Sequence, residues 1–496
     1  MVPGFFVSAS MRAMLSLLLA FCVSAFAATP AASEEPVFRV RLSEDLGTLD
    51  WNYGEVNPEI QYQLMEGLFR ADAKGKAVPA AAKSLFWGKD KKSLRILLDP
   101  LSRWSDGAPV CAQGFVDSWT RLKDPKFASP YAHYANIVKS VEAISCRELK
   151  ITFTRASPEA PALFSHYVFF PLRAEPLAKD PALFRSGKGL LVNGPYVVEE
   201  WKKNQRLVLS ANPRYGKAAP KVKKLEFYFV PDDGTAQVLF EQSKLDWMKD
   251  IPALLRTPAL EKGLTFRQFP SYTSFYFGVN ATRATLAQDP VIRRALSEAL
   301  AREELPKVLG REHRPARTWL PPTLSADVKA LPADGAVLAV AREKLVKAAA
   351  EGKMDLSLRV YNKSAHRLLA EWAQGQWEKK LGVRIPIEVQ EAKAYWKELS
   401  TNPPPLFLSG ITAPYAHPRA YLQEFLGGST ANWTGWTDEA YDRAVNDGDF
   451  AEAETLLEKA GYVIPLYTRD AVALVQKKWK SFSINPLGQA FLAELP

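Results

Sequence analysis

Alternating apolar and polar residues predict strands in the first third of the chain. The alternating segments are residues 37–42, 94–98 and 149–153. A period of two is typical of strands with one buried face, and the matching patterns favour pairing of the last two. Apolar residues recur at helical spacing over 112–122 and predict a helix. This helix is expected to end at Asp124, because Pro125 disfavours a helical residue before it.

The rest of the chain predicts further strands and helices. A hairpin is expected over 196–210, followed by a strand over 225–230. Helices are expected over 59–68 and 237–244, and another begins at Pro290, where proline suits the first helical turn. The mixture predicts an α/β fold.

Composition favours a large globular protein. Of the 496 residues, 47% are hydrophobic, which is enough for several cores. A chain of this length exceeds what one core normally organises, so two or three domains are expected. The formal net charge of +10 is spread along the chain. This spread favours solvated surface lysines over a nucleic-acid-binding face, while a weak attraction to acidic ligands or membrane surfaces stays open.

Residues 1–27 are typical of a secretory signal peptide. One basic residue, Arg12, precedes an apolar core, and Ala25 and Ala27 supply small residues for cleavage. A membrane anchor is the alternative, although the apolar run is short for crossing a bilayer. A lipoprotein signal is disfavoured, because a bulky phenylalanine precedes Cys22. We expect cleavage near residue 28 and a periplasmic mature protein.

One segment carries a specific family resemblance. Residues 104–134 read WSDGAPVCAQGFVDSWTRLKDPKFASPYAHY. This string resembles the signature of the family 5 extracellular solute-binding proteins, the oligopeptide- and dipeptide-binding receptors of ABC importers. Gly114 departs from the family, which has aspartate there. Similar motifs follow in the family's order at 193–196 (NGPY), 212–215 (NPRY) and 272–280.

The resemblance implies a periplasmic-binding-protein-like two-lobed (Venus-flytrap) fold with an extra third domain. The two lobes are expected to close over a ligand by movement at hinges near 269–271 and 468–472. The expected limits are 36–50, 170–268 and 470–496 for a discontinuous domain I, 51–169 for domain II and 269–469 for domain III.

The resemblance also implies a binding site that uses backbone more than side chains. Peptide receptors of this kind treat the ligand as an added strand, with wet side-chain pockets. The matching run is 409–418, in which Gly410, Tyr415 and Pro418 agree with the family's G-W-x-x-D-Y-x-x-P pattern. The candidate ligand-binding residues are Glu55, Val56, Asn57, Tyr131, Tyr272, Phe275, Ser409, Gly410, Ile411 and Tyr415.

Two positions of this run depart from the family. Ile411 replaces the tryptophan, and Pro414 replaces the aspartate that pairs with a peptide's α-amino group in the resembling receptors. Enclosing an ammonium group without a counter-charge is costly. We therefore expect a weaker preference for a free amine, unless another acid such as Glu55 reaches in. A ligand without an amine at that place is the other interpretation.

Cys111 and Cys146 remain after removal of the signal peptide. The family usually has a small hydroxyl residue at the position of Cys111, so two departures in one domain suggest a compensating bridge. An exported protein meets an oxidising compartment, which allows a disulfide between them. Two unbridged thiols are the alternative.

Nothing in the sequence indicates catalysis. HExxH, GxSxG and phosphate-loop motifs are absent, and the five histidines are scattered without metal-ligand spacing. We therefore expect no catalytic residues, no metal and no cofactor. The expected function is capture of a small peptide or peptide-like solute by a monomer, which delivers it to the permease of an ABC importer. A secreted peptide sensor or cell-wall-peptide scavenger without a permease is the alternative, and an exported hydrolase has the least support.

Overall fold

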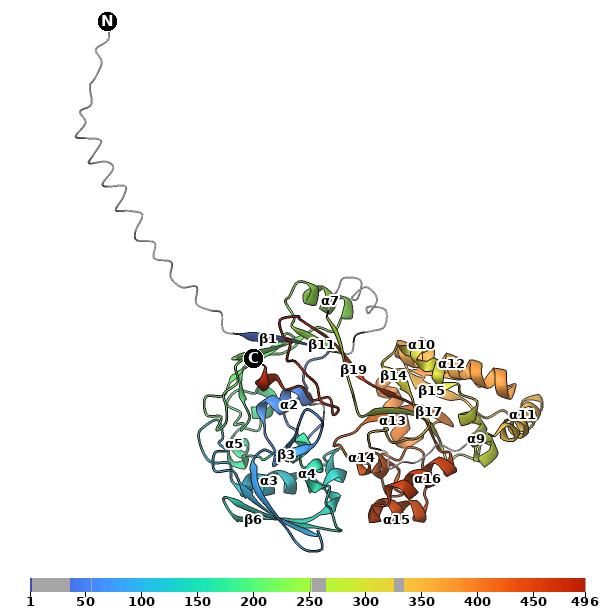
Figure 1. The fold of residues 1–496 in the computed structure, drawn as a ribbon, viewed down its shortest axis with the longest axis horizontal. Helices are drawn as coiled ribbons and strands as arrows, with labels where there is room; N and C mark the ends of the chain where they lie inside the picture. The colour runs from blue at the N-terminus through green and yellow to red at the C-terminus, as the bar shows by residue number, and fades with distance from the viewer. Residues whose placement is uncertain (2–35, 55, 250, 252–264, 325–333, 496) are drawn as a thin grey trace. The chain divides into compact units, whose positions relative to one another are not determined.

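The computed structural model describes Met1 and residues 36–495 except 55, 250, 252–264 and 325–333 (Figure 1). Residues 2–27 of the predicted signal peptide and Glu55 therefore lie outside the described residues. Within the part of the chain that is described, no helix combines the length and apolar character needed to cross a membrane.

A seven-stranded sheet collects strands from distant parts of the chain, in the order β12-β19-β11-β1-β10-β9-β8. Its strands are β1 (Val37–Leu42), β8 (Tyr196–Lys202), β9 (Arg206–Ala211), β10 (Lys224–Phe229), β11 (Trp247–Lys249), β12 (Phe266–Phe269) and β19 (Ala471–Val475). β1 runs parallel to β10, while β8, β9 and β10 are antiparallel neighbours. The predicted hairpin over 196–210 is confirmed, with Lys202 opposite Arg206.

A four-stranded sheet in the order β4-β5-β7-β6 carries the predicted pairing of 94–98 with 149–153. Its strands are β4 (Ala82–Trp87), β5 (Ser93–Leu98), β6 (Val138–Ser145) and β7 (Glu148–Phe153). β5 and β7 are antiparallel, with Leu94 opposite Ile151, so this prediction is confirmed. Helix α3 (Ala112–Lys123) ends before Asp124, as the proline that follows requires. The short strands β2 (Phe69–Ala71) and β3 (Ala77–Pro79) form a separate pair.

A six-stranded sheet in the order β14-β18-β13-β17-β15-β16 is built entirely from residues 273–469. Its strands are β13 (Thr273–Val279), β14 (His313–Pro315), β15 (Leu358–Tyr361), β16 (Ile387–Gln390), β17 (Leu406–Thr412) and β18 (Val463–Arg469). Helices α9 (Pro290–Glu298), α11 (Gly335–Ala350) and α12 (Ser364–Leu381) share an apolar core with it. Pro290 opens α9, and Asp289 caps it by accepting a hydrogen bond from the Val291 amide.

Shorter helices complete the described chain. They are α2 (Pro58–Leu64), α4 (Ala160–Leu163), α5 (Ala174–Lys179), α6 (Leu183–Ser186), α7 (Asp233–Glu241), α10 (Leu305–Leu309), α13 (Ala392–Thr401), α14 (Arg419–Leu422), α15 (Glu439–Asp447) and α16 (Phe450–Ala460). Two helix predictions were wrong at their ends. α2 stops at Leu64 because Met65 is extended and the next amide, of Glu66, donates to the Asn193 side chain. α7 begins earlier than expected because Asp232 caps it.

The chain passes between the seven-stranded and six-stranded sheets twice. The first passage is residues 270–272, from β12 to β13, and the second is Asp470, from β18 to β19. The first passage overlaps the predicted hinge segment 269–271 and the second lies within 468–472, and the hinge role of both stays a prediction. The strands of each sheet also come from the segments assigned to domains I, II and III, apart from the last residue of β12. The exact limits of the domains stay a prediction.

A disulfide joins Cys111 to Cys146, with 4.3 Å between their Cα atoms. Cys111 is the residue before α3, and Cys146 lies in the turn between β6 and β7. The Ala112 amide also donates to the Cys146 carbonyl at 2.9 Å. The bridge therefore ties the start of α3 to the edge hairpin of the four-stranded sheet.

Candidate ligand-binding site

Strand β17 has one edge that is paired only at its start. Its antiparallel partner β13 covers the other edge along the whole strand, from Leu406 to Thr412. The parallel partner β15 reaches only the first two residues, where Leu406 donates its amide to the Ser357 carbonyl. Further along this edge, the Leu408 carbonyl accepts the Tyr395 hydroxyl at 2.5 Å.

The same edge continues through Gly410 and Thr412. Residues of an antiparallel strand direct their backbone groups alternately to either side. Ala413 donates its amide to the carbonyl of Tyr272, the residue directly before β13. By the same alternation, the backbone groups of Ser409 and Ile411 also face β13. Those of Gly410 and Thr412 face away from it. Among the described residues, no group bonds the amides or carbonyls of Gly410 and Thr412 on this edge. The strand is therefore open to an added extended chain at two consecutive pairing positions.

Close packing between β13 and β17 explains the glycine at 410. A Cβ atom there would lie 2.8 Å from both the Phe275 ring and the Ser274 carbonyl oxygen. A side chain would push the two strands apart and change the direction of the open edge. The close approach therefore favours glycine at position 410, because a side chain would disturb both the packing of the two strands and the access of a ligand to the open edge.

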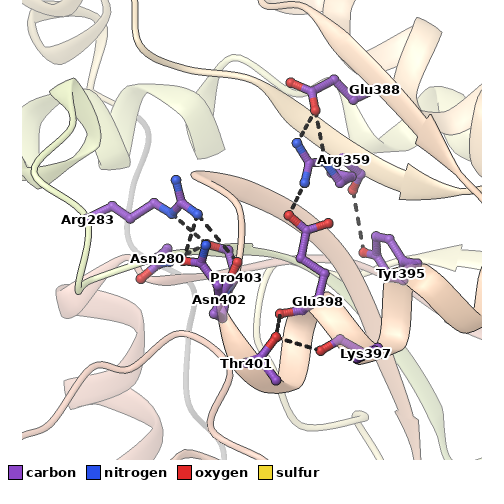
Figure 2. A network of polar contacts seen from close by, with 10 residues as sticks. All are labelled: Asn280, Arg283, Arg359, Glu388, Tyr395, Lys397, Glu398, Thr401, Asn402 and Pro403. Carbon is purple, nitrogen blue, oxygen red and sulfur yellow. Dashed lines mark hydrogen bonds and ion pairs between the residues drawn. The ribbon is translucent and has the colours of Figure 1, made fainter.

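An ion-pair network fixes helix α13 beside this edge (Figure 2). Arg359 of β15 donates its Nε to Glu388 of β16 at 2.9 Å and also pairs with Glu398 of α13. Tyr395 of the same helix reaches Leu408, as described above. Its neighbour Trp396 remains 37% exposed and stacks obliquely on Tyr361 and Trp433, at 5.3 and 5.5 Å between ring centroids. The network therefore holds an exposed aromatic surface next to the β17 edge.

A buried ion cluster joins the six-stranded part to the four-stranded part. The Arg419 Nε lies 3.0 Å from Glu159 Oε1, and the Arg419 and Glu159 side chains are only 5% and 3% exposed. Arg155 approaches the same carboxylate oxygen at 2.7 Å. Burial and the charge of Arg155 lower the Arg419 pKa, while Glu159 opposes that shift. His417 lies in the same charged surroundings, and burial lowers its pKa to about 4, so it is neutral at neutral pH.

A tyrosine cluster from the four-stranded part approaches the same region. Tyr131 stacks on Tyr134 with 6.5 Å between centroids and meets Tyr167 edge-on at 5.9 Å. Burial is the largest cause that raises the Tyr134 pKa, and the charges of Glu424 and Tyr415 raise it further. Tyr134 is therefore within electrostatic reach of both residues, which follow β17 in the chain.

The structure brings most of the predicted site residues together. Tyr272, Phe275, Ser409, Gly410 and Ile411 lie on β13 and β17 or directly before them. Tyr415 follows at the end of β17 but is 1% exposed, so its ring serves packing rather than an open surface. The roles of these residues in binding remain predictions.

Val56 and Asn57 occupy a different place. Together with residues 41–47 and Lys249 they line a polar cavity of about 570 Å³. The Asn57 side chain accepts the Ile60 amide and caps α2, so it has a structural task. No hydrogen bond or ion pair among the described residues joins either of them to β17. Glu55, which precedes them, lies outside the described part.

Sequence reasoning missed several neighbours of the β17 edge. Thr412 is adjacent to the predicted run, and Tyr134 ends the SPYAHY segment that supplied Tyr131. Glu424 gave a weak signal, since it is the only charged residue in the mostly apolar stretch 421–426. Glu159 and Arg419 gave none, because nothing local links two residues so far apart in the chain.

The three larger sheets, the two passages between the seven- and six-stranded sheets and the open strand edge have the architecture of a two-lobed solute-binding protein. The model of the bacterial extracellular solute-binding proteins, family 5 Middle, matches residues 76–433. The chain belongs to this family. The predicted family and the predicted fold class are therefore confirmed.

Individual relatives align along nearly the whole chain. The sequence is 27% identical to the probable deoxycholate-binding periplasmic protein YgiS of Escherichia coli, over 94% of each chain. It is 26% identical to the periplasmic murein peptide-binding protein MppA of E. coli, over 95% of this chain and 94% of MppA. The structure of Haemophilus influenzae OppA in complex with RPPGFSPFR has a TM-score of 0.81 at 22% identity, covering 93% of this chain and 99% of OppA. That likeness supports the fold.

Proposed function

We propose that this protein binds a peptide or peptide-like solute in the periplasm and delivers it to the permease of an ABC importer. The observation that carries the proposal is the open edge of β17 at Gly410 and Thr412. An extended peptide can pair with such an edge through main-chain groups, which gives affinity without reading the side chains. Relatives named for murein peptides and oligopeptides support the same ligand class.

The protein contributes binding and closure rather than catalysis in this proposal. Closure would bury the ligand between the lobes, with Trp396 and the tyrosines 131 and 134 as adaptable apolar walls. The energy for transport would come from the importer. The proposal also includes export by a cleaved signal peptide and action as a monomer.

Native mass spectrometry of freshly purified mature protein tests the ligand class. We expect a bound species in the mass range of small peptides, released on denaturation. Exclusively unliganded protein, together with no thermal shift across a diverse peptide library, would overturn the peptide assignment. A bound steroid acid would instead place the ligand with that of the relative named for deoxycholate.

Replacing Thr412 by proline should weaken peptide binding by about two- to tenfold. Proline removes the outward amide of the edge, and one net hydrogen bond is worth about 0.5–1.5 kcal/mol. Residue 411 is extended, as proline requires of the residue before it. The measurement is calorimetric titration with the peptide found in the purified protein.

The matched control for that variant is Thr412→Val. It keeps the amide but removes the hydroxyl that lies 2.8 Å from the Thr273 hydroxyl. We expect valine to bind peptide like wild type. Equal affinities of the proline and valine variants would show that the ligand does not use the Thr412 amide.

A further inference from the structure

Glu424 lies in a short turn whose neighbours are all anchored. The turn is the 3₁₀ segment η5 (Gln423–Phe425), which follows α14. The Tyr441 hydroxyl donates to the Leu422 carbonyl at 2.6 Å, and the Tyr415 hydroxyl donates to Gln423 Oε1 at 3.4 Å. The Phe425 ring meets Tyr276 edge-on at 5.6 Å. The backbone on both sides of Glu424 is therefore fixed.

The Glu424 carboxylate has no partner within the part of the chain that the structure describes. Among the described residues, none forms a hydrogen bond or ion pair with it. The guanidinium of Arg419 in the preceding helix is already engaged by Glu159 and by the Asn446 carbonyl. Glu424 is only partly exposed, and a carboxylate held among apolar and aromatic groups without a counter-charge is incompletely compensated.

The surroundings of Glu424 suit a cation. Burial is the main cause that raises the pKa of Tyr134, Tyr276, Tyr415 and Tyr441, and the charge of Glu424 raises each of them further, so all four hydroxyls are within its electrostatic reach. These tyrosines are uncharged at neutral pH. The carboxylate and the electron-rich faces of nearby aromatic rings both attract a cation.

The site is also next to the open strand. Tyr276 lies opposite Ser409 in the β13–β17 ladder, so both side chains project from the same face of the sheet. Ile411 projects from that face too, because side chains alternate along a strand. Glu424 retains some exposed surface, whereas Tyr415, Tyr441 and Phe425 are buried. Phe425, the residue after Glu424, packs on Tyr276, so the turn that carries the carboxylate lies against this face of the β13–β17 pair.

We propose that Glu424 is the counter-charge for an ammonium group of the ligand, a task that Pro414 cannot perform. The proposal rests on the proposed function and narrows its ligand class to amine-bearing peptides or peptide-like solutes. Burial raises the Glu424 pKa to about 7, so the empty site holds a partly protonated carboxyl. A bound ammonium would favour the ionised form, and the carboxyl proton would leave to the solvent.

Calorimetry with tri-, tetra- and penta-alanine and their N-acetylated forms tests this assignment. We expect wild type to bind the free-amine forms at least about tenfold more tightly, the range of one charge-assisted hydrogen bond. Glu424→Gln should remove this preference and leave the affinity for acetylated peptides unchanged. Glu303→Gln is the control, since Glu303 pairs with Arg317 on the exposed surface.

A second readout separates recognition from a structural role. Titrations at pH 7 in two buffers of different ionisation enthalpy report protons released on binding. A carboxyl with a pKa of about 7 should release about half a proton when the free-amine peptide binds to wild type. Glu424→Gln should release none, and acetylated peptides should release none from either protein.

Each contrary result has a distinct meaning. A wild type that binds both forms equally, or a Glu424→Gln variant that keeps the preference, overturns the role of Glu424. In the second case Glu55→Gln identifies whether that acid carries it. If neither form binds while native mass spectrometry shows no peptide, the proposed function fails together with this inference.

Discussion

Replacing Glu159 by glutamine should weaken ligand binding by at least about a hundredfold. The change leaves the guanidinium groups of Arg155 and Arg419 close together without a counter-charge. Removing one partner of a buried ion pair costs about 3–5 kcal/mol, because the remaining charge stays desolvated. Separation of the two lobes would rehydrate Arg419, so the cost falls on the closed arrangement that holds the ligand.

Arg419→Met makes the comparison sharper. In that variant Glu159 still pairs with Arg155, so no buried charge is left alone and we expect a loss of less than about tenfold. Calorimetric affinities for the same peptide give the ranking, and denaturant unfolding of the ligand-free proteins shows whether the fold is affected. If Glu159→Gln binds as tightly as wild type, the cluster does not form in the ligand-bound protein.

Loss of the Cys111–Cys146 bridge should destabilise the mature protein by about 3–4 kcal/mol in the chain-entropy model, for a sequence separation of 35 residues. The double variant Cys111→Ser/Cys146→Ser is compared with wild type by denaturant unfolding, with and without reductant. Reduced wild type should unfold like the variant, and reductant should leave the variant unchanged.

Thiol labelling gives an independent check of the same bridge. Mature wild-type protein, denatured without reductant, should label at neither cysteine. Stoichiometric labelling of both would show that the bridge is absent from the exported protein. The stability difference between wild type and the double variant should then vanish as well.

Local patterns predicted the parts of the fold that local physics decides. The β8–β9 hairpin, the pairing of β5 with β7 and the end of α3 before Pro125 depend on neighbouring residues. The end of α2 depends on Asn193, which lies far along the chain. Such a contact competes with helix propensity and leaves no mark in the helix sequence itself.

The same division applies to the site. The run around Gly410 was found from its resemblance to the family, and the structure explains it by the unpaired edge. Val56 was predicted from the same resemblance, yet it lines another cavity. Glu424 became a candidate only from its surroundings, because a single glutamate in an aromatic stretch does not reveal whether it has a partner.

The two passages between the large sheets restrict the relative motion of the two lobes. β12 pairs with β19 on one side, β13 pairs with β18 on the other, and Asp470 accepts hydrogen bonds from Gln268 of β12 and Arg314 of β14. Two adjacent crossings act as a two-point hinge, which allows rotation about one axis and resists torsion about the others. Opening and closing should therefore follow a single angular coordinate, so that each lobe returns to the same alignment after every cycle of loading and release.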